Sequence, residues 1–222
     1  TSNEIIYDVR EKMKVFSDDI DITDEYIFHL INVKRALLLK QRFSKTSRDI
    51  PEEVKQIICI DMQEVSDIDG ICQGQSLLLK STEKIPASIE IGGRSAIINV
   101  RVPSITSKFL NLIPIERLPF IGNNKYLQNM TYIAMDADNM LYSKTTGAPS
   151  LFEKVKVTGV YFNPEEAFSM SCDTDESCDF YEEEYPIEGY IVSDLVNMIV
   201  KELSVTLNLQ EDKINNADES NR

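Results

Sequence analysis

The chain has 222 residues and carries 37 acidic against 23 basic side chains, which gives a net charge of −14 at pH 7. Its length allows one domain or two small ones with a sizeable core, so neither a metal nor a disulfide is needed to explain folding. Trp is absent and His29 is the single histidine, which excludes a multi-histidine metal site or a histidine-based triad within one chain.

Residues 1–50 are predicted to form a helical hairpin. Ser2 or Asn3 can cap a first helix, and Thr23 can cap a second one whose acidic start and basic end match the helix dipole. Apolar residues of the second helix fall in two rows, so one row can face another subunit. The residues expected to meet a partner there are Tyr26, Val33, Lys34, Arg35 and Leu37. Charge reversal at Lys34 and Arg35 is expected to disturb docking to a partner more than folding.

Residues 51–185 are predicted to form a β-rich lobe. After a short helical start at 51–53, a strand is expected from Ile57 to Val65. A hairpin is expected around Gly92 and Gly93, because two glycines supply the positive φ angles of a tight turn. A second hairpin is expected around the turn at 136–139, followed by a strand from Val155 to Phe162.

The stretch from Val157 to Val200 contains no Lys or Arg and eleven carboxylates. Without it, 26 acidic residues face 23 basic ones, so the acidity of the chain is local. Because proteins hold nucleic acid chiefly by neutralising phosphates with Lys and Arg, this stretch would repel DNA and RNA. It favours protein partners or water, with residues 165–185 expected to form an acidic loop.

Part of this loop matches the spacing of a calcium-binding loop. The oxygen ligands would include Asp173, Asp175, Asp179 and Glu184, but Cys178 stands where the glycine of such a loop is required. A solvated or partner-facing acidic loop is therefore favoured over a cation site.

The four cysteines show no metal-binding spacing. Cys59 lies in a predicted strand and is expected to be a small buried hydrophobe, while Cys172 and Cys178 are expected to be plain thiols. With no basic and apolar leader and no long apolar run, a reducing cytosol is the expected compartment and a membrane span is not expected.

Residues 186–209 are predicted to form a long helix with Pro186 in its first turn, and the polar residues 210–222 a tail that orders on a partner. The predicted fold class is α+β, with the N-terminal helical hairpin and the C-terminal helix packed together and the β-rich lobe inserted between them. There is no phosphate-binding loop, and the carboxylates have no rigid scaffold, so neither an enzyme nor a cofactor is expected.

Several stretches, in this order, resemble the head-to-tail adaptor proteins of short-tailed bacteriophages, and the sequence is most similar to a ring protein of crAss-like phages. The stretches are residues 4–12, 21–24, 116–122, 157–164 and 210–216.

The resemblance implies a structural virion protein of the neck or tail, made in the host cytoplasm. Such proteins form a homo-oligomeric ring, typically of twelve copies, beneath the portal protein and seat the next tail or ring protein. DNA passes through the lumen without sequence-specific binding, and no membrane is involved. In the tail of the chain, the residues expected to contact a partner are Glu211, Asp212, Asn215 and Asn216. The alternatives are a monomeric protein-binding module or tail hub component without portal contact, and then a cation-binding or hydrolytic enzyme.

Overall fold

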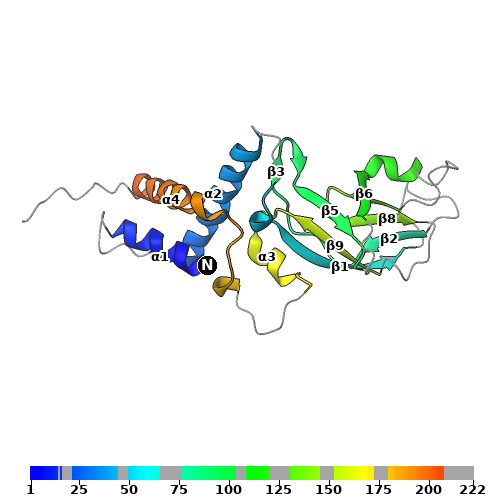
Figure 1. Ribbon diagram of the computed structural model, residues 1–222, viewed down its shortest axis with the longest axis horizontal. Coiled ribbons are helices and arrows are strands. Elements are labelled where there is room, and N and C mark those ends of the chain that lie inside the picture. The colour runs from blue at the N-terminus through cyan, green and yellow to red at the C-terminus, as the bar shows by residue number, and fades with distance from the viewer. Residues whose placement is uncertain are drawn as a thin grey trace, which may run out of the picture.

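The computed structural model describes residues 1–14, 16, 22–44, 50–65, 77–103, 109–120, 131–145, 153–172 and 180–207. The described part is elongated, with three helices at one end and a barrel of strands at the other (Figure 1). The N-terminus lies among the helices.

Three helices build the first end of the molecule: α1 (Ser2–Met13), α2 (Asp24–Ser44) and α4 (Val192–Thr206). Thr1, rather than Ser2 or Asn3, caps α1, because its hydroxyl accepts a hydrogen bond from the backbone N–H of Glu4 in a capping box. The expected cap of α2 is confirmed by the hydrogen bond from the Tyr26 backbone N–H to the Thr23 hydroxyl.

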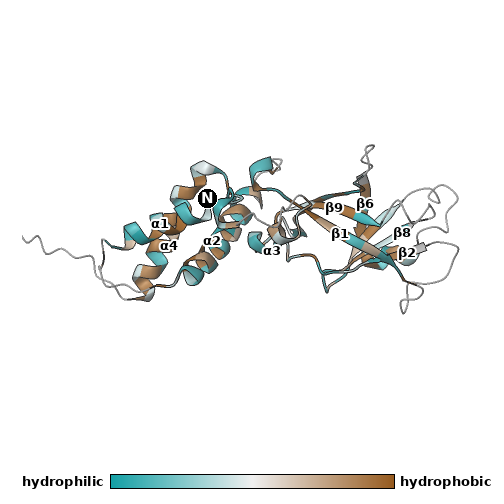
Figure 2. Ribbon diagram, turned by 90° about the horizontal axis from the view of Figure 1, so that it is seen from below, coloured by the Kyte–Doolittle hydropathy of each residue, from teal (hydrophilic) through white to brown (hydrophobic). Residues whose placement is uncertain are grey.

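Residues from all three helices share one apolar core, and Figure 2 shows hydrophobic segments along α1 and α4. The side chains in this core that are at most 1% exposed are Val9, Ile27, Ile31, Leu195, Ile199 and Leu203. Leu195, Ile199 and Leu203 recur every four residues, which is the spacing of one face of a helix. The expected first turn at Pro186 is wrong: a short 3-10 helix, η5 (Gly189–Ile191), precedes α4.

Seven strands of the described ranges form the second end of the molecule, and they close into a barrel in the order β1-β2-β8-β7-β6-β5-β9. Their bounds are β1 (Gln56–Glu64), β2 (Leu77–Ser81), β5 (Ile97–Arg101), β6 (Phe109–Pro114), β7 (Tyr132–Met135), β8 (Leu141–Thr145) and β9 (Lys154–Gly159). All neighbours pair antiparallel except β6 and β7, which are parallel. Inward side chains such as Ile58, Val100 and Val157 are fully buried and give the barrel a core of its own.

The predicted fold class is therefore wrong. In place of a β-rich lobe inserted into an α+β fold, the middle of the chain forms a closed barrel. The sequence pattern missed β2 and β6, and the closing pair between β1 and β9 joins residues about a hundred positions apart. Local periodicity reports which residues form strands, but it says nothing of pairing over such distances.

Both expected hairpins are confirmed. The small hairpin of β3 (Glu90–Ile91) and β4 (Arg94–Ser95) turns at Gly92 and Gly93, whose φ angles are +60° and +74°. The hairpin of β7 and β8 turns at Asn139, the one described residue other than glycine with a positive φ, at +60°. Asn tolerates this conformation better than most residues because its short polar side chain bonds locally.

Short helices cover the barrel and join it to the long helices. They are η1 (Glu52–Val54), η2 (Ile115–Phe120), α3 (Pro164–Ser169) and η4 (Phe180–Glu182). Leu118 of η2 packs on Leu78, Ala134 and Tyr142, which alternate with inward residues and so lie on the outer face of β2, β7 and β8. At the other end of the barrel, Leu39 and Phe43 of α2 share an apolar cluster with residues of η1, residues that flank the β3–β4 hairpin, and Val160 directly after β9.

Candidate interaction surface

The apolar row predicted on α2 for a partner lies mostly at the surface. Tyr26 is 45% exposed and Leu37 is 40% exposed, while Val33 is half-buried between them. The other row, with Ile27, Leu30 and Ile31, is buried in the helical core. The α2 stripe, by which we mean Tyr26, Val33 and Leu37, therefore presents apolar surface that the described part of the chain leaves open.

Lys34 and Arg35 do not share one environment. The Lys34 ammonium forms an ion pair with Glu202 of α4, and the Lys34 side chain is only 17% exposed. Arg35 is fully buried, and its guanidinium donates from Nε to the Pro186 carbonyl at 2.7 Å and from Nη1 to the Tyr161 carbonyl at 2.8 Å. The expectation that Arg35 meets a partner is corrected, because its side chain holds α2 to the end of β9 and to the segment before η5.

The surroundings of Arg35 are neutral rather than acidic. Its guanidinium carbon lies 5.5 Å from the centroid of the Tyr185 ring, and the Tyr185 hydroxyl donates to Asn32 Oδ1 at 2.7 Å. Burial lowers the pKa of Arg35, and burial also raises the pKa of Tyr185 far above its ordinary value. The phenol therefore stays neutral, and the carbonyl oxygens and the ring face stabilise the guanidinium in place of a carboxylate.

An acidic groove lies beside the start of α1. It has a volume of about 610 Å³ and lies between α1, η1 and the segment from Glu184 to Val192. Its carboxylates are Glu4, Asp8, Glu53 and Glu184, and its apolar lining includes Ile5, Tyr185, Ile187 and Val192. A groove with carboxylates around apolar side chains suits a basic side chain with an aliphatic stem.

Most of the other predicted contact residues lie outside the described residues. This applies to Asp173, Asp175 and Asp179 of the cation candidate and to Glu211, Asp212, Asn215 and Asn216 of the tail. Glu184 is described, and it is exposed at the acidic groove. Within the described ranges, no three His, Cys, Asp or Glu side chains are grouped so as to hold a metal ion.

The expected roles of two cysteines are wrong. Cys59 and Cys172 form a disulfide, whereas the sequence predicts a buried hydrophobe for the former and a plain thiol for the latter. Cys59 points outward from β1, between the exposed Ile57 and Asp61, and is only half-buried. The two cysteines are 113 positions apart, so no spacing rule for neighbouring cysteines could have indicated the pair.

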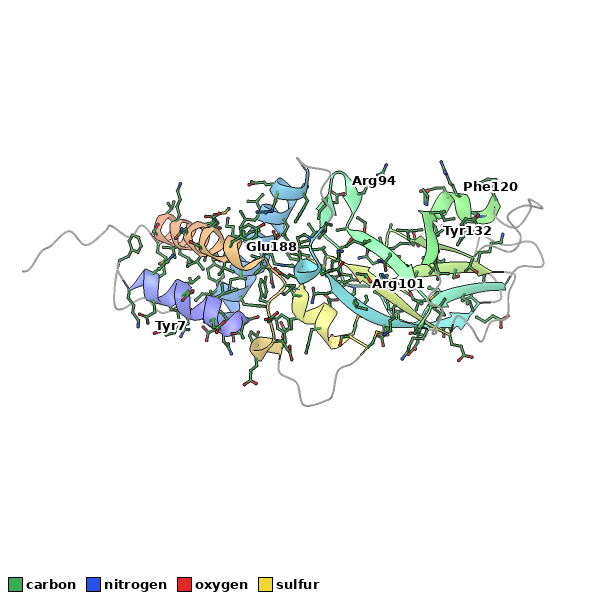
Figure 3. All side chains as sticks on the ribbon, viewed as in Figure 1. Tyr7, Arg94, Arg101, Phe120, Tyr132 and Glu188 are labelled. Atoms are coloured by element: carbon green, nitrogen blue, oxygen red, sulfur yellow. A yellow bond between two sulfur atoms is a disulfide. The ribbon has the colours of Figure 1, made fainter. Side chains whose placement is uncertain are left out.

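Three aromatic residues of the described ranges that are at least 60% exposed were not predicted as surface features. Phe120 of η2 is 76% exposed, near the end of the molecule away from the helices (Figure 3). Tyr7 of α1 is 62% exposed, and Tyr190 of η5 is 60% exposed with the Arg42 guanidinium 4.5 Å from its ring centroid. The sequence did contain a signal for Tyr7, because helical spacing places it on the face opposite the apolar Ile5 and Val9.

Among the helices of the described ranges, none is long and apolar enough to cross a membrane.

Comparison with known proteins agrees with a role in assembly. Residues 4–221 match the family model described as phage tail ring protein 2. Over 223 aligned residues the chain is 34% identical to Ring protein 2 of Bacteroides phage crAss001, and the alignment covers 98% of this chain and 96% of that protein. The chain is thus a structural ring protein of a bacteriophage virion. In particular, it belongs to the phage tail ring protein 2 family, which confirms the resemblance to crAss-like phage ring proteins.

Proposed function

We propose that this chain is a head-to-tail adaptor, which forms a ring beneath the portal protein in the virion neck and seats the next tail component. Family membership supports the ring, and the order of the elements along the chain supports the adaptor role. In this proposal the ring has twelve copies, is made in the host cytoplasm and lets DNA pass through its lumen without sequence-specific contacts. Residues 1–50 and 186–209 act together as the docking part, 51–185 as the projecting part, and 210–222 as a tail that orders on a neighbour.

The α2 stripe is the observation that carries the proposal. A ring of identical copies needs two different surfaces on each copy, because its contacts run head to tail. Tyr26 and Leu37 lie about three turns apart on one face of a 21-residue helix, and each is at least 40% exposed. Tyrosine is enriched among the residues that contribute most to binding, and such residues are buried near the centre of an interface. Contact with a neighbouring copy would bury them.

The acidic groove supplies a candidate for a second surface. Its carboxylates lie on α1, η1 and the segment before η5, whereas the α2 stripe occupies a different helix. Electrostatic complementarity between a groove of this kind and a basic side chain selects the partner and its orientation. The acidic groove therefore sets register in the ring, and the α2 stripe contributes the apolar burial.

Assembly can be tested with purified protein, alone and with the portal protein of the same phage. We expect closed rings and a ring–portal complex by native mass spectrometry and electron microscopy. The double variant Tyr26→Asp and Leu37→Asp should weaken ring formation at least tenfold, since a charged carboxylate would have to be desolvated in the contact. Its Tm should stay within about 2 °C of the wild type, because both side chains are already at the surface.

Tyr7→Asp is the control, since Tyr7 is an exposed tyrosine on another helix, at 62% against 45% for Tyr26. It should leave ring formation unchanged. Rings that never bind the portal would point instead to a tail hub component. If the wild-type protein stays monomeric in the presence of the portal protein, the adaptor role is rejected. If the double variant forms normal rings, the α2 stripe is not part of the contact between copies.

A further inference from the structure

The disulfide between Cys59 and Cys172 lies at the edge of the first part of β1, before the pairing of β1 with β2 begins. β1 pairs with β2 only from Met62 to Glu64, so no strand of the described ranges lies beside the first part of β1 on that side. The end of α3 takes that place, because the Cys59 backbone N–H donates to the Met170 carbonyl at 2.8 Å. Ala167 of α3 is fully buried in the barrel core, which fixes the helix against the same edge.

This backbone contact holds the two cysteines at bridging distance. Their Cα atoms are 5.0 Å apart, inside the range that a disulfide spans without movement of the backbone. Since the hydrogen bond and the buried Ala167 do not depend on the sulfur atoms, reduced cysteines would remain close enough to react. Both side chains are half-buried rather than enclosed, so a small reagent can reach them.

Lys156 favours reaction at Cys59. It stands directly opposite Cys59 in the pairing of β1 with β9, and both side chains point to the outer face of the barrel. Cβ atoms of directly opposite residues lie about 5 Å apart. From that position the Lys156 side chain is long enough to bring its ammonium group beside Cys59, and a neighbouring cation favours the thiolate, which is the form that attacks disulfides.

We propose that Cys59 and Cys172 form a clamp that closes by thiol–disulfide exchange after the subunit has folded, and that it fixes the start of the acidic segment on the barrel. The oxidant is a low-molecular-weight disulfide. The Cys59 thiolate attacks one of its sulfurs and expels a thiolate, and the Cys172 thiolate then attacks Cys59 Sγ and expels the second. Two protein thiols are oxidised and one small disulfide is reduced to two thiols. The timing rests on the proposed function, because cytoplasmic synthesis keeps thiols reduced until the particle is released.

The clamp matters because the acidic segment begins directly after it in the chain. Cys172 is followed by Asp173, the first of the acidic residues up to Glu184. A closed clamp ties one end of that segment to β1, while the other end is held at η4, where Phe180 packs in the helical core. Oxidation thus adds a covalent link from β1 to the residue that precedes the acidic segment, at a distance along the chain from the α2 stripe.

The test starts from purified full-length protein that is reduced with a phosphine while folded and then exposed to oxidised glutathione. We expect the intact mass to fall by about 2 Da, the mass of two hydrogens, with peptide mapping that assigns the new bond to Cys59 and Cys172. Reduction should lower Tm by about 5 to 10 °C and should increase hydrogen exchange at the Cys59 amide. Lys156→Gln should slow closure severalfold without changing the final pairing.

The matched control is the double variant Cys72→Ser and Cys178→Ser. It should form the disulfide between Cys59 and Cys172 as the wild type does. Reducing the folded wild type avoids variants that fail to fold. Pairing through Cys72 or Cys178, or identical Tm and Cys59 exchange in both redox states, would overturn the clamp. Ring formation is measured in the same samples by native mass spectrometry, so a protein that closes the clamp but forms no ring contradicts the proposed function alone.

Discussion

At the scale of single residues, Arg35 connects the two ends of the molecule. It projects from α2 and donates to carbonyls of Tyr161, after β9, and Pro186, before η5. We expect Arg35→Glu to lower the free energy of unfolding by about 3 to 5 kcal/mol, because a buried carboxylate would face two carbonyl oxygens with no donor. Urea denaturation followed by circular dichroism would measure the loss.

Lys40→Glu is the matched control on the same helix. Lys40 is 53% exposed and its ammonium lies 3.8 Å from Glu90, so its reversal should change stability by less than about 1 kcal/mol. Arg35→Lys should fall between the two variants, since an ammonium cannot reach both carbonyls in the fork geometry of a guanidinium. Equal stability of Arg35→Glu and Lys40→Glu would mean that the junction does not depend on Arg35.

At the scale of elements, the turn of the β3–β4 hairpin depends on positive φ angles at Gly92 and Gly93. A Cβ at either position meets no atom within 4 Å, so the cost of substitution there is backbone strain and not collision. We expect Gly92→Val to destabilise the fold by about 1 to 2 kcal/mol, whereas Gly92→Asn should cost less than about 0.5 kcal/mol. Thermal unfolding would show which of the two variants loses more stability. Equal losses in both would mean that collision or a lost glycine-specific contact, and not backbone strain, sets the cost.

The same elements show what the sequence could predict. Hairpins at Gly92 and Asn139 were foreseeable, because turn residues and flanking alternation are local signals. The barrel was not, since β6 pairs parallel with β7 and β1 pairs with the distant β9. The α2 stripe followed from helical periodicity, but periodicity could not distinguish Lys34 from the neighbouring Arg35. Only the approach of β9 and Pro186 buries the latter.

At the scale of the whole molecule, every copy carries a net charge of −14, so the response of the ring to salt depends on what the acidic groove faces. If the acidic groove faced only a lumen, carboxylates of neighbouring copies would repel one another and salt would strengthen the ring. A concave groove with an apolar lining of Ile5 and Ile187 suits an inserted basic side chain better than an open channel wall. We therefore expect salt to weaken the ring, since screening shortens the reach of charges from about 10 Å at 0.1 M to about 3 Å at 1 M.

Removal of the groove charges should abolish this response. In the triple variant Asp8→Asn, Glu53→Gln and Glu184→Gln, ring formation at low salt should fall severalfold and should no longer depend on ionic strength. A control with three exposed carboxylates outside the groove, Glu83→Gln, Glu165→Gln and Glu166→Gln, removes the same charge and should keep the salt dependence. Native mass spectrometry or analytical ultracentrifugation between about 0.1 M and 1 M salt would compare them. Rings that grow more stable with salt, and still more stable in the triple variant, would place the groove on the lumen, because removing like charges then relieves repulsion between copies.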